Sequence, residues 1–319
     1  MSSGHLINRV AILGAGLIGG SFALALKKYT QGMHISAWDR PEAAARAKEL
    51  GAADAVFSGE LRAAISDADL IYVALPIGTT LDVLPEIARH AAAHALVTDA
   101  CSTKVRITQA AEEVFPVSGS ALFVGGHPMA GKESGGIANA DADLFRDTTY
   151  ALIGATQSSN EDLTEISPAK DPAMRTPGAR RTAAELCVEP RVSALLTIIA
   201  KIGARPMWLG AQQHDYAVGL ASHLPQLAAV ALGSFLYDHL DENGLPIALA
   251  GPGLRDSLRL TGSPYSTWRD IVLTNREVLS ASLDLFARRL DELRDKLASR
   301  ELEADFEAAN ELYKLLRSF

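Results

Sequence analysis

One histidine in the chain stands in a setting that suits proton transfer. His127 lies inside the glycine- and proline-rich stretch Gly125–Gly131, directly after the apolar run Ala121–Val124. This pattern predicts a short buried strand that delivers the imidazole to a loop at its C-terminal end. Ligands of doubly wound α/β domains bind at the carboxyl ends of the strands, and an imidazole changes charge near neutral pH. His127 is therefore a candidate acid or base, with a core or capping histidine as the alternative.

A second candidate site lies near the start of the chain. The apolar run Val10–Leu13 is followed by Gly14-Ala15-Gly16-Leu17-Ile18-Gly19 and then by the helix formers of Ser21–Leu26. Glycines with this spacing allow a tight turn, close approach of a pyrophosphate, and close packing of a helix on a strand. The N–H groups at the start of the helix would then face the phosphates. The pattern predicts a dinucleotide site, and the alternative is a glycine turn that serves packing only. The candidate cofactor contacts are Gly14, Gly16, Leu17, Ile18 and Gly19.

An acidic residue strengthens the dinucleotide prediction. Asp39 ends the predicted strand His34–Trp38 and lies about 20 residues beyond Gly19, where a carboxylate would bind the adenosine ribose hydroxyls. A carboxylate there repels a 2′-phosphate, so it favours NAD over NADP. Arg40 follows directly and could accept that phosphate, so NADP stays possible.

The elements that must position these residues alternate between strand and helix. Apolar strands are predicted over 70–75 and 95–98, with helices over 42–50 and 79–93 between and around them. Such alternation indicates a doubly wound parallel sheet with right-handed crossovers. Further strands are expected at Thr149–Gly154 and Arg205–Leu209, the latter closing the sheet after a helix near 190–202. Residues 157–181 are polar and proline-rich, and we expect an exposed loop there.

Two strand ends in this sheet carry further candidates. Leu75 and Pro76 close one strand and are expected to line the cofactor cleft, although a plain strand-to-helix turn is equally consistent. Ser102 opens the helix after the next strand, where it is the natural N-cap and also faces the cleft. Lys104 would add positive charge for an anionic substrate or be solvated.

Strand patterns stop after residue 210, and the remainder is predicted to be all-helical. We therefore expect an α/β domain over 1–210 and a helical domain over 211–319. The apolar stripes of the helical part exceed what one small domain needs, which suggests a homodimer interface.

Composition narrows the possible partners. A net charge of −8 gives no basic surface for nucleic acid. No apolar run approaches the roughly 20 residues that span a bilayer, so no membrane is expected. The N-terminus shows no secretory signal, and the two cysteines lie far apart without a metal-binding spacing. We expect a cytoplasmic protein without a metal site.

Several separated motifs together resemble one family, the prephenate/arogenate (cyclohexadienyl) dehydrogenases of tyrosine biosynthesis. The resemblance runs from Val10 to about Asn275. Its motifs are the glycine stretch 14–21, Asp99–Lys104, Gly126–Gly131, His214-Asp215, Ser222–Pro225, Arg255–Arg259 and Trp268–Asp270. The resemblance implies a Rossmann domain followed by a helical dimerisation domain. It also implies oxidative decarboxylation of prephenate or arogenate with hydride transfer to NAD.

The resemblance also implies roles for particular residues. It gives His127 the part of proton acceptor, with Ser102 in the hydrogen-bond network around the substrate hydroxyl and near the cofactor. It gives Arg259 the ring carboxylate and lets Arg255 assist, because an arginine fork meets a carboxylate with two bonds. From the residues alone, the two arginines fit a solvated helix face better. Ser222, Gln226, Trp268 and Glu133 are further candidate substrate contacts, while capping, packing and surface roles stay open for them.

One departure from the family pattern and two alternative functions remain. Some members of the family carry a histidine where this chain has Gln226, so the choice between prephenate and arogenate, and inhibition by tyrosine, are left open. His214 and His223 are expected to be structural, bonded to backbone or to Asp215. One alternative function is another dehydrogenase or reductase of the 3-hydroxyacid or imine type. The other is a dinucleotide sensor without catalysis, which His127, Ser102 and Arg259 together disfavour. No regulatory module is expected after the helical part.

Overall fold

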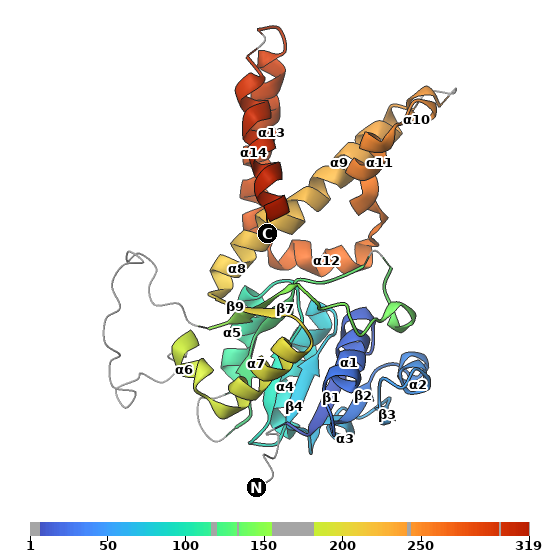
Figure 1. Cartoon of the computed structure of the whole chain (residues 1–319), viewed down its shortest axis with the longest axis vertical. Helices are drawn as coiled ribbons and strands as arrows, with labels where there is room; N and C mark the ends of the chain where they lie inside the picture. The colour runs from blue at the N-terminus through green and yellow to red at the C-terminus, as the bar shows by residue number, and fades with distance from the viewer. Residues whose placement is uncertain are drawn as a thin grey trace.

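The computed structural model describes residues 7–115, 120–132, 134–154, 182–240, 244–299 and 301–318. An α/β part comprises the described residues up to Gly210, and helices extend away from one end of it in two arms (Figure 1). The predicted loop at 157–181 and the candidate Glu133 lie outside the described residues.

A six-stranded parallel sheet forms the centre of the α/β part. Its strand order is β3-β2-β1-β4-β5-β6, so the order reverses between β1 and β4. In doubly wound sheets this reversal creates the crevice in which a dinucleotide binds. The strands are β1 Arg9–Leu13, β2 His34–Trp38, β3 Ala55–Phe57, β4 Leu70–Val73, β5 Leu96–Asp99 and β6 Leu122–Val124.

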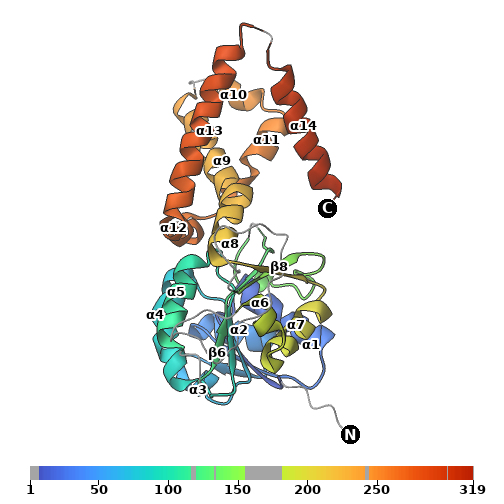
Figure 2. The same ribbon diagram turned by 90° about the vertical axis from the view of Figure 1, so that its left-hand side faces the viewer.

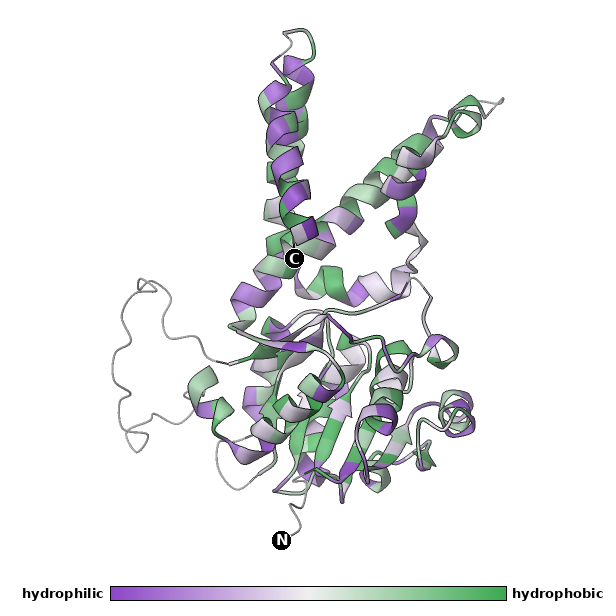
Figure 3. Cartoon of the chain, in the orientation of Figure 1, coloured by the Kyte–Doolittle hydropathy of each residue, from purple (hydrophilic) through white to green (hydrophobic). Residues whose placement is uncertain are grey.

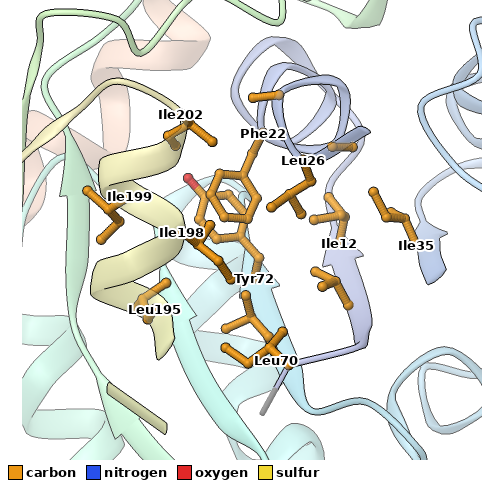
Figure 4. Close-up of a cluster of buried hydrophobic side chains, with 14 of the residues drawn as sticks. Ile12, Phe22, Leu26, Ile35, Leu70, Tyr72, Leu195, Ile198, Ile199 and Ile202 are labelled. Carbon is orange, nitrogen blue, oxygen red and sulfur yellow. The ribbon is translucent and has the colours of Figure 1, made fainter. Parts of the chain in front are cut away.

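Helices cover both faces of this sheet, which explains why its central strands are almost continuously apolar. One face packs against α1, α2 and α7, and the other against α3, α4 and α5. On the first face, Phe22 of α1 stacks on Tyr72 of β4 with ring centroids 3.9 Å apart, beside the isoleucines of α7 (Figure 4). The helices are α1 Leu17–Tyr29, α2 Pro41–Glu49, α3 Arg62–Ile65, α4 Ile77–His90, α5 Val105–Val114, α6 Ala183–Cys187 and α7 Pro190–Lys201, with a 3₁₀ turn η1 Ile137–Asn139.

A second sheet of three strands corrects two expectations. Its strands are β7 Gly126–Pro128, β8 Thr149–Ile153 and β9 Arg205–Leu209, in the order β7-β8-β9. β9 therefore does not close the large sheet, and His127 lies within a strand rather than in a loop. The chain leaves β6 through two glycines, and a Cβ on Gly126 would stand 2.7 Å from the carbonyl oxygen of Asp99. The backbone passes close to the end of β5 here, and the chain then pairs antiparallel with β8 as β7.

The remainder of the described chain is helical. It begins with a continuous helical run that contains a π-helical turn, η3, between α8 and α9. The elements are α8 Ala211–Val218, η3 Gly219–His223, α9 Leu224–Asp238, α10 Leu245–Ala248, α11 Pro252–Leu258, the 3₁₀ turn η4 Arg259–Gly262, α12 Tyr265–Thr274, α13 Arg276–Lys296 and α14 Glu303–Ser318. Pro225 does not end the run, because the π-helical turn η3 passes directly into α9.

The continuous helical run Ala211–Asp238 corrects the expectation that no apolar segment approaches the length that spans a bilayer. Its most apolar stretch has a mean hydropathy of 1.3, and by length and composition it could span a membrane. Polar residues along it, His214, Asp215, His223 and Gln226, are nevertheless buried, and each is hydrogen-bonded within the protein. These contacts tie the run to the rest of the protein, although only 28% of its most apolar stretch is buried in a single chain.

The two arms leave much apolar surface uncovered. α9 and α11 form one arm, α13 and α14 the other, and α12 lies across the α/β part below them (Figures 1 and 2). Apolar segments alternate with polar ones along both arms (Figure 3). Large exposed side chains in them include Phe235, Leu285, Leu290, Phe306 and Leu316. A single chain therefore leaves part of its apolar stripe in contact with water.

Candidate active site

The glycine loop between β1 and α1 has space for a ligand at one position only. Gly14 has φ 94°, and a Cβ there would stand 2.4 Å from the carbonyl oxygen of Ala74. A Cβ on Gly19 would stand 1.9 Å from the carbonyl oxygen of Gly14, so both glycines are required by packing. At Gly16, by contrast, a Cβ would meet no atom within 4 Å. The loop is closed on the protein side and open at Gly16, as a pyrophosphate cradle must be.

The start of α1 is left for an anion. Gly16 is its N-cap, no side chain caps the helix, and its first turn holds no acidic residue. Gly16, Leu17 and Ile18 are partly exposed, while Gly19 and the residues after it up to Ala23 are buried. The unpaired N–H groups of a helix start bind phosphate well, so these residues fit the group that the sequence predicts.

Asp39 is tied directly to this loop. Its Oδ2 accepts a hydrogen bond from the Ala15 N–H at 2.7 Å, and its Oδ1 accepts one from the Arg40 N–H at 2.7 Å. The carboxylate thus stands at the loop, where it can still accept ribose hydroxyls with its remaining lone pairs. Arg40 is exposed beside it. Leu75 also reaches the loop, since its Cδ2 would lie 3.1 Å from a Cβ on Gly14, and exposed Pro76 caps α4 next to it.

A buried ion pair anchors the strand that carries His127. Lys104 and Asp99 are fully buried and bonded to each other. Asp99 also accepts from the Gly126 N–H at 3.1 Å, and Lys104 donates to the Gly126 carbonyl at 2.7 Å. The backbone group just before His127 is therefore held from both sides. Lys104 is neither solvated nor a contact for an anionic substrate, which corrects both expectations for it.

The start of α5 is capped from the helical part of the chain. The Asp215 carboxylate accepts from the Lys104 N–H at 2.7 Å and from the Val105 N–H at 2.9 Å. Ser102 is therefore not the N-cap, because α5 begins three residues later and a carboxylate with two oxygens already satisfies its first N–H groups. Ser102 is partly buried in the connection between β5 and α5.

His127 meets a second histidine across the boundary between the two parts. Its Nδ1 lies 2.8 Å from Nε2 of His214, with the rings inclined at 66°. His214 is bonded in turn to Asp215, at 2.8 Å from Nδ1 to Oδ1. The sequence predicts a bond from His214 to backbone or to Asp215, and the structure shows the second. The sequence does not predict the contact with His127, since nothing in either local pattern links two residues so distant in the chain.

The surroundings of His127 keep its imidazole neutral. Burial lowers its pKa well below the ordinary value of 6.5, and its electrostatic interactions with His214, Lys104 and His223 act in the same direction. A neutral imidazole at neutral pH can accept a proton. Of the two ring nitrogens, Nδ1 is engaged by His214, so Nε2 is the one that remains for a substrate.

The candidates in the helical part lie in different settings. Ser222 is partly buried in the π-helical turn, and such turns occur often at functional sites. Gln226 is buried, and its amide donates to the Leu260 carbonyl at 2.9 Å. Trp268 is partly buried and meets the His223 ring edge-on, with centroids 5.8 Å apart. It also packs beside Ile77 and Cys101 of the α/β part.

The two arginines are exposed. Arg255 lies on α11, which belongs to the arm above α12 in Figure 1, and Arg259 begins η4 directly after it. The Gln226–Leu260 bond ties this arm to α9 one residue beyond Arg259. The structure thus brings together His127, His214, Asp215 and the Ser102 connection at one edge of the sheet, while the arginines face solvent.

The sheet order, the open glycine loop and the neutral imidazole at the same edge define a dinucleotide-dependent dehydrogenase with a helical second part. The chain matches the family description "Prephenate dehydrogenase, nucleotide-binding domain" over residues 22–169 and "Prephenate dehydrogenase, dimerization domain" over residues 210–317. It belongs to the prephenate dehydrogenase family.

Individual relatives agree with this assignment. The chain is 31% identical over 300 residues to a prephenate dehydrogenase of Lactococcus lactis, covering 93% of this chain and 73% of the relative. It is 28% identical over 298 residues to a cyclohexadienyl dehydrogenase of Zymomonas mobilis, covering 93% and 90% of the two chains. Among solved structures, a prephenate dehydrogenase of Aquifex aeolicus in complex with hydroxyphenyl propionate and NAD⁺ superposes with a TM-score of 0.78 at 24% identity, over 98% of both chains.

Proposed function

We propose that the protein catalyses the oxidative decarboxylation of prephenate, arogenate or both, with NAD as hydride acceptor, in tyrosine biosynthesis. Family membership and the neutral imidazole of His127 support this most directly. The solved relative from Aquifex aeolicus binds NAD⁺ and a hydroxyphenyl acid, which fits the same chemistry.

The reaction requires a base for a ring alcohol. The C4 hydroxyl of the substrate loses its proton to Nε2 of His127 as a hydride leaves C4. Bound NAD supplies the acceptor for that hydride. The C1 carboxylate then departs as carbon dioxide, and the ring becomes aromatic, which makes the step effectively irreversible. Because His127 is neutral near pH 7, it can take the proton without first losing one.

Other residues bind and orient. Gly14, Gly16, Leu17, Ile18 and Gly19 would hold the pyrophosphate, Asp39 the ribose hydroxyls, and Leu75 and Pro76 one wall of the cofactor cleft. Ser102 would bond the substrate hydroxyl. Arg259, assisted by Arg255, would bind the carboxylates. Ser222, Gln226, Trp268 and Glu133 are proposed as further substrate contacts.

The helical part from residue 211 onward would also join two copies. The family description of this part names it a dimerization domain. A second copy would cover exposed side chains such as Phe306 and Leu316, which are 67% and 70% exposed in one chain. We propose a homodimer of chains that each hold a cofactor-binding part, 1–210, and a helical part, 211–319. Two free cysteines fit a cytoplasmic location. A monomeric mass at micromolar concentration would contradict the dimer.

One assay tests the reaction. Purified protein is mixed with NAD and either prephenate or arogenate, and reduced cofactor is followed by its absorbance. Turnover of one or both substrates is expected, and no turnover of either would overturn the proposal.

The same assay with His127→Asn should show kcat lower by about 10²- to 10⁴-fold with little change in substrate binding. Arg259→Gln should chiefly raise KM, and an unchanged KM would place the carboxylate site elsewhere.

A further inference from the structure

The contacts of Asp215 fix where the proton of the neighbouring imidazole lies. Its Oδ1 accepts from the Lys104 N–H at 2.7 Å and lies 2.8 Å from Nδ1 of His214. Its Oδ2 accepts from the Val105 N–H at 2.9 Å. A carboxylate that receives backbone N–H groups on both oxygens has no proton to donate. The hydrogen of the contact with His214 must therefore reside on Nδ1 of His214.

The position of the hydrogen on His214 determines its position on His127. A neutral histidine with its hydrogen on Nδ1 has only a lone pair on Nε2. Nε2 of His214 lies 2.8 Å from Nδ1 of His127, so His127 must be the donor in that bond. His127 then carries its hydrogen on Nδ1, and its Nε2 presents a lone pair. Without a partner at Nδ1, the hydrogen could reside on either nitrogen, and a ring with its hydrogen on Nε2 cannot act as a base there.

We propose that His214 is a positioning residue that, held by Asp215, fixes the tautomer and the ring orientation of His127 so that Nε2 accepts the substrate proton. The proposal deepens the proposed function, because it rests on His127 as the base. His214 and Asp215 are 1% and 2% exposed, so water does not compete for these bonds.

Among the described residues, the charged and titratable groups near His127 come from β5, the start of α5, η3 and α8. β5 and α5 bring Asp99 and Lys104, which neutralise each other in a buried pair. η3 brings His223, where burial lowers the pKa to about 4, so that it is neutral near pH 7. α8 brings His214 and Asp215. Asp215 is thus the carboxylate that reaches the histidine pair through a hydrogen bond, and it sets the direction of the donor chain.

Three variants separate positioning from general structural support. His214→Leu removes the acceptor for His127 and keeps an apolar side chain in the buried site. His214→Gln can donate its NH₂ to Asp215 and offer its oxygen to His127, so it imitates the neutral histidine. Thr274→Val is the matched control, because it removes another hydrogen bond between the two parts, 2.7 Å from Thr103 Oγ1 to Thr274 Oγ1, without contact with either histidine.

The kinetic result expected is specific. His214→Leu should lower kcat by about 10- to 100-fold with KM within about twofold of wild type, since base catalysis is weakened but binding is not. His214→Gln should recover most of the lost kcat, and Thr274→Val should leave kcat within about twofold. Equal impairment of His214→Leu and His214→Gln, or an unchanged kcat in His214→Leu, would overturn the proposal.

A second measurement does not depend on turnover. Long-range ¹H–¹⁵N correlation spectra of the full chain labelled with ¹⁵N-histidine report which ring nitrogen carries hydrogen, and His127 is assigned by its loss in His127→Asn. The wild-type protein and His214→Gln should show His127 protonated on Nδ1 at neutral pH. Hydrogen on Nε2 in the wild type would overturn the proposal, even if His214→Leu does not fold. If neither substrate turned over, the proposed function would fail while this result still decided the tautomer.

Discussion

Three of the helices that begin at the carboxyl edge of the parallel sheet, α1, α4 and α5, differ in what occupies their first turns. The Asp215 carboxylate caps α5, and the Asp270 carboxylate accepts from the Gly78 N–H at the start of α4 at 3.0 Å. Both carboxylates come from the helical part. The start of α1 has no capping side chain and no acidic residue in its first turn.

The capped helix starts attach the helical part, whereas the uncapped start of α1 is open to a ligand. A helix start carries partial positive charge and unpaired N–H groups, so a carboxylate or a phosphate stabilises it. The helical part uses two of these starts to attach itself to the α/β part. The third, at Gly16, faces open space and is left for a pyrophosphate. The same local chemistry therefore serves assembly at two positions and cofactor binding at the third.

Removal of the Asp215 carboxylate, which caps the start of α5, should have the largest effect on stability. Asp215→Ala deprives two N–H groups and His214 of their acceptor, so we expect a loss of about 2–4 kcal/mol in the free energy of unfolding. Denaturant unfolding measures it. The control is Asp82→Ala, an exposed residue on α4, which should change stability by less than about 0.5 kcal/mol. Similar values for the two variants would show that α5 does not need its cap.

A carboxylate placed on the open helix start should act in opposite directions on folding and on cofactor binding. Gly16 stands at the N-cap in extended conformation, and a side chain there meets no neighbour. Gly16→Asp should keep or slightly raise stability, but weaken NAD binding by about 1.5–3 kcal/mol, because it fills the start of α1 and repels phosphate. Titration calorimetry with NAD measures the affinity. If neutral Gly16→Asn, which is nearly the same size, weakens binding equally, charge is not the cause.

The carboxylate beside that loop should decide between the two nicotinamide cofactors. Asp39→Ser keeps an acceptor for the Ala15 N–H and removes the negative charge. We expect the ratio of kcat/KM for NADP to that for NAD to rise by about tenfold or more, which corresponds to about 1.4 kcal/mol. Steady-state kinetics with both cofactors checks this. An unchanged ratio would show that Asp39 orders the loop without contacting the ribose.

The Asp270 carboxylate, which bonds the start of α4, should contribute least to the free energy of unfolding. Asp270→Asn weakens the bond to Gly78 and removes the charge, and we expect a loss of about 0.5–1.5 kcal/mol. The pKa of Asp270 is lowered chiefly by the Gly78 N–H. Its stabilisation is therefore present above the unfolded-state pKa near 4 and is lost as the pH falls through the lower folded value. Denaturant unfolding between pH 2 and 7 should show a smaller acid loss in the variant, and equal losses would contradict the assignment. Asp284→Asn on exposed α13 is the control.

Local patterns in the sequence were enough to predict the glycine loop and the parallel sheet. The glycine spacing, the apolar strand before it and Asp39 beyond it predict a loop that the structure forms, because these interactions join neighbouring segments of one βαβ unit. The alternation of strand and helix likewise predicts the parallel sheet. The comparison with known proteins confirms the family that the separated motifs resemble.

Only the tertiary structure decided how the histidine is supported. His214, Asp215 and Lys104 come to His127 from segments far apart in the chain, and no period or spacing encodes which buried polar groups will meet. The prediction of Ser102 as N-cap was wrong for the same reason, since a distant carboxylate took that position. Short-range propensity fixes helices, strands and turns. Which polar groups share a buried site depends on the packing of two separately formed parts, where each donor must find an acceptor out of reach of water.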